Sequence, residues 1–231
     1  IVGFALAAFV GIFLSTHTVL AATINVDGVV CTLADAITAA NTNAAVGGCS
    51  AGAAGQDTLI LSNNITLSNG LPSITSEIII QGSSNTVERD PTFTCPDAVN
   101  PEFRIFRIAV PGNLTLSNVT VSNGCAHGNS TAGQGDGIYN SGILTMDSAD
   151  IITGNMALGV CTDNTCSTGA GEGGGIYNDA GTLTIDNGSV IQNIAQGGDA
   201  LCSPGCSNGP GSGGSIYSAG GSVDVDDGLI L

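Results

Sequence analysis

The fold is decided by GGGIYN at residues 173–178 and LTID at residues 183–186, because both elements occur twice more in the chain. The copies are GIYN and LTMD at 137–140 and 144–147, and SIYS and VDVD at 215–218 and 223–226. Ile138 and Ile176 are 38 positions apart (176 − 138), and Ile176 and Ile216 are 40 apart (216 − 176). A shorter, earlier copy is LTLSNVTV at 114–121. Such a period is typical of a repeat array in which each repeat is one structural unit.

Each repeat alternates short strands with glycine or asparagine corners. Residues 144–146 and 183–185 alternate apolar and polar side chains, which is the period of a strand with one buried face. Gly and Asn tolerate the positive φ of sharp corners. We therefore predict an all-β fold, a right-handed parallel β-helix solenoid with a short N-terminal capping helix. In that fold Tyr139, Tyr177 and Tyr217 form a file along the axis, and Asn140 stacks on Asn178.

The repeats differ mainly after Asn155 and Asn193, where each carries an insert rich in Gly and Ser. We expect one rung of about two dozen residues per repeat, with the inserts as loops at one recurring corner. Loops confined to one face can form the functional face of a solenoid. The favoured alternative is that each loop is a solvated spacer pinned by a disulfide.

Upstream of the repeats, Thr32 and Asp35 have the spacing of a capping box, which predicts a short helix over residues 33–40. Strands are expected near 58–61, 65–67, 77–80 and 103–110. The helix and a loop closed by Cys31 and Cys49 would cover the exposed end of the first rung. The predicted organisation is a cap over 22–57 and β-helix rungs over 58–231. The chain ends inside a predicted strand at 229–231, so we expect the rungs to be incomplete at the C-terminus.

Residues 1–22 form an apolar run that contains no Asp, Glu, Lys or Arg and ends in VLAA. This pattern predicts a signal peptide over 1–21. Polar residues at 15–18 interrupt the run and favour cleavage, with a retained N-terminal anchor as the alternative. The chain does not begin with Met and no basic residue precedes the run, so we expect the reading frame to begin further upstream.

The charge is strongly one-sided. The chain has 19 acidic residues, three Arg, no Lys and a formal net charge of −16. Such a surface repels phosphate backbones and anionic lipid headgroups, which disfavours binding of nucleic acid and of acidic membranes. Anionic polysaccharides would also be repelled unless Ca²⁺ bridged the charges.

Eight cysteines in an exported chain indicate a disulfide framework. Proximity favours local bridges, although eight cysteines allow about 105 pairings. The pairs that we predict are Cys31 with Cys49, Cys95 with Cys125, Cys161 with Cys166, and Cys202 with Cys206.

No set of catalytic residues stands out. Arg89, Arg104 and Arg107 are the candidate bases for a polysaccharide lyase, but salt bridges with the nearby Glu88, Asp90 and Glu102 are the favoured interpretation. His127 is expected to be a solvated loop histidine.

The aspartates that recur in the repeats form a candidate calcium site. Asp147, Asp186 and Asp226 recur once per repeat, so their carboxylates could lie in a line about 5 Å apart and bind Ca²⁺. The favoured alternative is that each aspartate caps the N–H groups of a turn. We therefore predict no cofactor, with calcium as the only candidate.

Residues 31–43, continuing to Cys49 and to DTLIL at 57–61, resemble the N-terminal box of the CSLREA-domain proteins. These are exported bacterial right-handed β-helix proteins, often with GGGIYN repeats like residues 173–178. The box differs at Thr32, Ala34 and Asp35, where the family has Ser, Arg and Glu. The GGI element at 174–176 is also similar to polymorphic outer-membrane autotransporter passengers, without their Phe-x-x-Asn motif. The resemblance implies a pectin-lyase-like fold and an extracellular location, but it implies little about activity.

These observations predict a secreted or cell-surface β-helix protein that is a non-catalytic structural or adhesin-like passenger or stalk. The alternative is a carbohydrate-active enzyme, a polysaccharide lyase or glycoside hydrolase, with its site on further rungs. The expected partners are cell-surface glycans or proteins of a host or neighbouring cell. We expect no nucleic-acid partner and no transmembrane segment after removal of the signal peptide.

Overall fold

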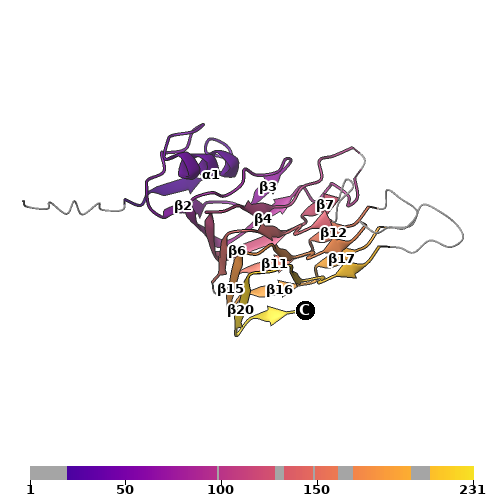
Figure 1. Ribbon diagram of the computed structural model, residues 1–231. Helices are drawn as coiled ribbons and strands as arrows, with labels where there is room; N and C mark the ends of the chain where they lie inside the picture. The colour runs from indigo at the N-terminus through magenta and orange to yellow at the C-terminus, as the bar shows by residue number, and fades with distance from the viewer. Residues whose placement is uncertain (1–19, 98, 128–132, 148, 161–168, 199–208) are drawn as a thin grey trace, which may run out of the picture.

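The computed structural model describes residues 20–231 apart from 98, 128–132, 148, 161–168 and 199–208. The described chain is nearly all β-structure, coiled into a solenoid of stacked rungs (Figure 1). The single helix of this part, α1 (Leu33–Thr42), lies beside the first rungs. The predicted fold class, a parallel β-helix solenoid with a short N-terminal capping helix, is confirmed. The predicted signal peptide lies almost entirely outside the described residues.

The strands form four parallel sheets that run along the solenoid. The largest contains eleven strands: β1 Thr23–Val26, β2 Asp57–Leu61, β3 Ile65–Leu67, β4 Glu77–Arg89, β6 Asn113–Ser122, β10 Ile143–Met146, β11 Ile151–Thr153, β15 Thr182–Asp186, β16 Ser189–Ile191, β20 Ser222–Asp226 and β21 Leu229–Ile230. The second contains β5 Phe106–Ile108, β9 Ile138–Asn140, β14 Ile176–Asn178 and β19 Ile216–Ser218. The two three-stranded sheets contain β7 Cys125–His127, β12 Met156–Leu158 and β17 Ile194–Gln196, and β8 Gly133–Gln134, β13 Gly171–Glu172 and β18 Gly211–Ser212. Each of the three smaller sheets therefore collects one side of successive rungs, whereas the largest collects two sides, because β10 and β11 of one rung both pair with β6.

The three sequence copies stack in register. Tyr139 pairs with Tyr177 and Tyr177 with Tyr217 across β9, β14 and β19. The second element aligns in the same way, with Leu144 opposite Leu183. The earlier copy joins them, because Leu114 pairs with Leu144. The alignment of repeats that the sequence suggested is therefore the pairing of strands in space.

The core is a continuous column of aliphatic side chains inside the coil. From β1 to β16 the inward apolar positions of the large sheet are buried, including Leu59, Ile80 and Leu183, whereas Val223 and Val225 of β20 in the last rung are exposed. Their outward neighbours are more exposed, as in β15, whose five residues alternate between exposed and buried. Burial of this column is the main favourable contribution to folding, at about 25 cal/mol per Å² of apolar surface.

The helix α1 covers the N-terminal end of this column. Thr32 is its N-cap, accepting a hydrogen bond from the Asp35 N–H at 3.1 Å and donating one to Asp35 Oδ2 at 2.8 Å. Leu33 and Ile37 are buried against the core. The Cys31–Cys49 disulfide joins the segments before and after the helix. The sheet itself begins with β1, which pairs with β2 and lies within the residues assigned to the cap.

One corner of every late rung requires glycine. Gly135, Gly173 and Gly213 occupy equivalent positions and have φ values of 63°, 61° and 61°. A Cβ atom on Gly173 would lie 2.4 Å from the Ile176 carbonyl oxygen. The left-handed backbone and the close approach therefore both exclude other residues at this corner.

Two strands differ from their predicted extents. The strand expected at 77–80 continues to Arg89 as β4, with an irregular register between Gln81 and Asn85 against β6. Gly82 allows this, because a Cβ there would lie 2.3 Å from the Asn118 carbonyl oxygen. The strand expected at 103–110 is reduced to β5, because Phe103 instead bridges to Cys125 in antiparallel sense.

A carboxyl group is buried among these strands. Asp150 is 1% exposed, and its Oδ1 accepts a hydrogen bond from the Val119 N–H at 2.8 Å. Its Oδ2 has no hydrogen-bond partner in the described part of the chain. Burial raises the pKa of Asp150 to about 7, against the opposing effect of the Val119 N–H.

This carboxyl should make stability depend on pH between about 4 and 7. The folded state retains a proton that the unfolded state releases above its ordinary pKa, so the free energy of unfolding should fall as the pH rises through this window. The fall amounts to at most about 4 kcal/mol. Asp150→Asn should flatten it, as measured by urea unfolding at a series of pH values. Asp186→Asn, the loss of an exposed carboxylate, is the matched control. An unchanged slope in Asp150→Asn would contradict the assignment.

Candidate binding site

The site is built around residues 90–105, here called the cross-linked loop, which follow β4 and precede β5. Its centre is Arg89, the last residue of β4, whose side chain is fully buried. The guanidinium donates hydrogen bonds to the carbonyl oxygens of Pro101 (3.0 Å), Phe93 (3.2 Å) and Thr94 (2.8 Å). It also lies 3.9 Å from Asp97 Oδ2. One side chain thus holds two parts of the loop, at 93–94 and at 101, against the solenoid.

The prediction that Arg89 forms salt bridges with its sequence neighbours is wrong. Its ion pair is with Asp97, and its hydrogen bonds are to backbone carbonyl groups. The physical reason is burial, which lowers the pKa of Arg89 and requires every donor to be satisfied nearby. The loop supplies those acceptors by folding back over the end of β4.

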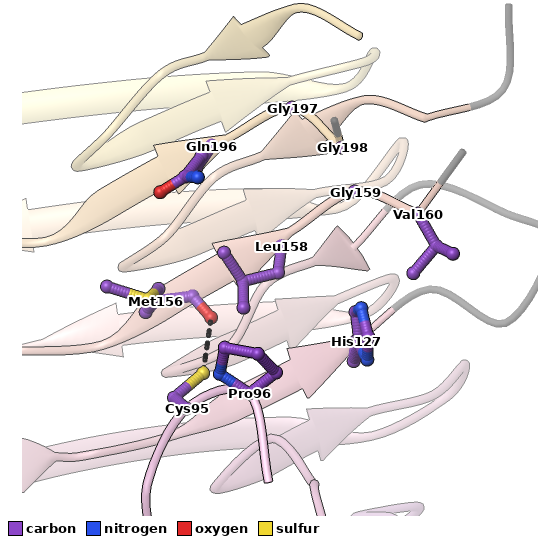
Figure 2. Close-up of a pocket in the computed structure, with 10 residues that line it drawn as sticks. All are labelled: Cys95, Pro96, His127, Met156, Leu158, Gly159, Val160, Gln196, Gly197 and Gly198. Carbon is purple, nitrogen blue, oxygen red and sulfur yellow. Dashed lines mark hydrogen bonds between the residues drawn. The ribbon is translucent and has the colours of Figure 1, made fainter. Parts of the chain in front are cut away.

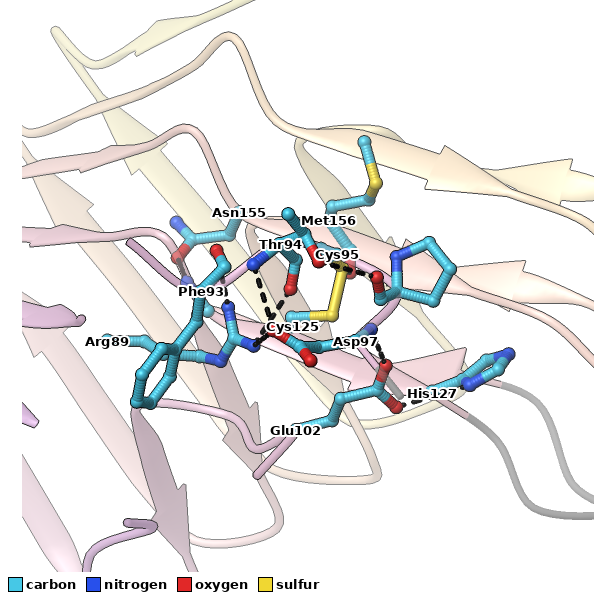
Figure 3. Close-up of a disulfide and its surroundings, with 12 residues drawn as sticks. Arg89, Phe93, Thr94, Cys95, Asp97, Glu102, Cys125, His127, Asn155 and Met156 are labelled. Carbon is cyan, nitrogen blue, oxygen red and sulfur yellow. Dashed lines mark hydrogen bonds and ion pairs between the residues drawn. A yellow bond between two sulfur atoms is a disulfide. The ribbon is translucent and has the colours of Figure 1, made fainter. Parts of the chain in front are cut away.

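A disulfide fixes the loop to the solenoid, and Figure 3 shows it beside the Arg89 contacts. Cys95 of the loop is bonded to Cys125 of β7, with their Cα atoms 5.8 Å apart. This pair and Cys31–Cys49 confirm two of the four predicted bridges. The Cys161–Cys166 and Cys202–Cys206 pairs lie outside the described residues.

Asp97 and Glu102 connect the loop to His127. Asp97 accepts hydrogen bonds from the N–H groups of Asn100 and Val99, which hold its pKa well below its usual range. Glu102 accepts a hydrogen bond from the Asp97 N–H and lies 3.2 Å from His127 Nδ1 (Figure 3). His127 is the last residue of β7. The predicted exposure of His127 is confirmed, but the residue ends a strand rather than lying in a loop, and the cross-linked loop brings a carboxylate to its imidazole.

Two hollows flank the cross-linked loop, and His127 borders both. The first, here called the Met156 hollow, has a volume of about 350 Å³ and runs along the sheet of β7, β12 and β17 (Figure 2). Its lining residues are Cys95, Pro96, His127, Met156, Leu158, Gly159, Val160, Gln196, Gly197 and Gly198. The described ends of the inserts meet here, because the Gly159 N–H donates to the Gln196 carbonyl at 2.8 Å. The placement of the inserts themselves lies outside the described residues.

The second hollow, here called the Arg107 hollow, has a volume of about 380 Å³. Two of the three arginines of the chain line it. Its lining residues are Gly70, Leu71, Ser73, Glu102, Phe103, Arg104, Arg107, Ala126 and His127. Positive charge is scarce in this chain, so the hollow is the one place among the described residues where two cationic side chains line the same cavity.

The tyrosines form the file that the sequence predicted, and two arginines meet its first ring. The ring centroids of Tyr139 and Tyr177 are 5.2 Å apart, and those of Tyr177 and Tyr217 are 5.4 Å apart. The guanidinium carbon of Arg104 lies 4.8 Å from the centroid of Tyr139, and that of Arg107 lies 5.7 Å from it. Both distances are within the range of cation–π attraction. The predicted ion pairs of Arg104 and Arg107 with neighbouring acidic residues do not occur among the described residues, because the aromatic file takes their place.

The asparagine ladder is confirmed as well. Asn140 Nδ2 donates to Asn178 Oδ1 at 2.7 Å, and both side chains are fully buried. A second ladder joins Asn155 Nδ2 to Asn193 Oδ1 at 2.9 Å. Neither asparagine of the second pair was recognised as a ladder position, although each precedes an insert in its repeat.

The aspartates proposed for calcium are aligned but exposed. Asp186 pairs with Asp226 across β15 and β20. Asp147 occupies the equivalent position one rung earlier, because the residues just before Asp147 and Asp186, Met146 and Ile185, pair with each other. The residues that the structure describes contain no group of three or more His, Cys, Asp or Glu side chains that could share a metal ion. Calcium binding at this line stays a prediction.

Asp136 is a site residue that the sequence interpretation missed. It is fully buried beside Arg104, and burial raises its pKa well above the ordinary range while the Arg104 charge opposes this. The Ala126 N–H also acts to lower this pKa, but neither carboxylate oxygen makes a hydrogen bond of normal geometry in the described structure. A signal was available, because Asp136 precedes GIYN where the later copies have Gly174 and Gly214.

A scan against protein-family models and searches of curated proteins and of solved structures returned no match to the chain. The site is therefore interpreted from its own geometry and chemistry. Of the helices in the described ranges, α1 is the only one, and it is too short to cross a membrane.

Proposed function

We propose that this chain is an exported β-helix of the CSLREA-domain type, located at or beyond a bacterial cell surface. Its stacked rungs serve as a structural or adhesin-like stalk rather than as an enzyme. The cross-linked loop and its two hollows form the recognition surface, with cell-surface glycans or proteins of a neighbouring cell as partners.

The observation that carries this proposal is the pair of disulfides. Cys31–Cys49 closes the cap and Cys95–Cys125 ties the cross-linked loop to β7. Both disulfides therefore lie where irregular segments of the described chain, the cap and the cross-linked loop, pack on the solenoid. Disulfides form and persist in oxidising compartments, which supports export. The apolar run of residues 1–22 supports the same destination.

The stack supports a stalk because side-chain ladders join its later rungs. Asparagine ladders and the tyrosine file repeat the same contacts along the axis. Repeats of this kind contact only their neighbours, so a solenoid gives an extended and regular surface.

Export and oxidation can be tested together in a Gram-negative host that expresses the full chain. We expect the protein outside the cytoplasm, shortened by removal of residues 1–21 as mass spectrometry would show, and without titratable thiols. The control lacks residues 1–21 and should remain in the cytoplasm with reduced cysteines. Retention of the full chain in the cytoplasm with free thiols would contradict export.

The structural role is tested by incubating the purified protein with a panel of polysaccharides. Turnover of any of them at enzymatic rates would refute that role.

A further inference from the structure

The Arg107 hollow concentrates positive charge at the start of the tyrosine file. Arg107 of β5 pairs in register with Tyr139 of β9, so it occupies the file position of the preceding rung. Arg104 reaches the same ring from the end of the cross-linked loop. Two guanidinium groups therefore meet on one tyrosine, and both line the hollow.

These two charges have little compensation from the protein. Among the residues that the structure describes, the ion pair of Arg89 with Asp97 and the contact of Glu102 with His127 include neither Arg104 nor Arg107. Arg104 Nε is buried and has no hydrogen-bond partner in the described part. A buried donor without a partner is costly, so an acceptor that reached Arg104 Nε would be stabilised there.

Asp136 is the nearest candidate counter-charge, and it is poorly suited to that role. It is fully buried, and among the described residues its oxygens make no hydrogen bond of normal geometry, although the Ala126 N–H acts to lower its pKa. Burial favours its neutral form, and its attraction to Arg104 only partly opposes this. Glu102, the other acidic residue of the hollow, is engaged with His127 and the Asp97 N–H.

We propose that the Arg107 hollow binds the carboxylate of an acidic sugar carried on an otherwise neutral glycan. A planar carboxylate matches the fork of guanidinium donors. The net charge of −16 disfavours ligands with many negative charges, so an isolated carboxylate fits best. A glycan is favoured over a peptide because Ser73 and His127 border the arginines with groups that exchange hydrogen bonds with hydroxyls. The inference names a ligand for the proposed recognition surface.

The test uses the purified, disulfide-bonded protein at low ionic strength, with binding followed by NMR titration and calorimetry. We expect saturable binding of sodium D-glucuronate, weaker binding of acetate and no binding of D-glucose. Arg107→Gln should weaken glucuronate binding by about tenfold or more, because it removes a charge-assisted contact. Arg107 is exposed, so this variant should fold. Gln81→Glu changes the net charge by the same one unit at an exposed position outside the hollow, and should bind like the wild type.

Several results would overturn the proposal. These are the absence of saturable glucuronate binding, equal affinity in Arg107→Gln and the wild type, and acetate or glucose binding as tightly as glucuronate. Tighter binding of acetyl-triglycine, which carries a peptide carboxylate, would show that the hollow is a peptide site. None of these results bears on export or thiol oxidation, so failure here is distinguishable from failure of the proposed function.

Discussion

Replacing Arg89 with Gln should lower the free energy of unfolding by about 3–5 kcal/mol, the usual effect of removing one partner from a buried charge pair. The substitution removes the donors that reach Phe93, Thr94 and Pro101. It also leaves Asp97 without its cation. Urea unfolding should show a lower midpoint, and hydrogen exchange should show reduced protection in β5 and β7.

The matched control is Arg107→Gln, the same change at an exposed arginine. Its free energy of unfolding should change by less than about 1 kcal/mol, because surface charge contacts contribute little. Similar losses in the two variants would show that Arg89 does not organise the cross-linked loop.

The second large effect is expected from Asn178→Ala, which should destabilise the fold by about 2–4 kcal/mol. Asn178 accepts a hydrogen bond from Asn140 and donates to the carbonyl oxygens of Gly181 and Gly220. All of these groups lie between rungs, where water cannot replace the lost amide. Thermal and urea unfolding measure the loss.

An exposed asparagine provides the control for this variant. Asn69 is exposed, and its side chain donates a long hydrogen bond, of 3.5 Å, to the hydroxyl of its neighbour Ser68. Asn69→Ala should therefore change stability by less than about 0.5 kcal/mol. If Asn178→Ala were equally mild, the ladder would not be a source of stability.

The features that could be predicted from the sequence are those that repeat. Strand register followed from the aligned copies, because identical positions in successive rungs must stack when the coil closes at a constant period. Tyr139 and Asn140 were placed correctly for this reason. The disulfide between Cys95 and Cys125 followed from proximity, once the other cysteines were paired locally.

The features that could not be predicted depend on the cross-linked loop, which occurs once. The acceptors of Arg89 are backbone carbonyl groups, and every residue carries one, so the sequence does not mark them. The position of Arg107 under Tyr139 depends on where β5 begins, and that is set by the length of the loop. Nothing in a periodic pattern specifies how an irregular segment folds back.

The in-register stack has a consequence for how such a chain can change in length. Removing residues 138–175, which make up one whole period, would place Ile176 directly after Gly137 and leave Arg107 facing Tyr177 instead of Tyr139. Loss of a single residue within a strand would instead turn every following side chain to the opposite face. Duplication or loss of complete periods is therefore the conservative route by which this architecture can lengthen or shorten, with the junction to the cap and the cross-linked loop left intact.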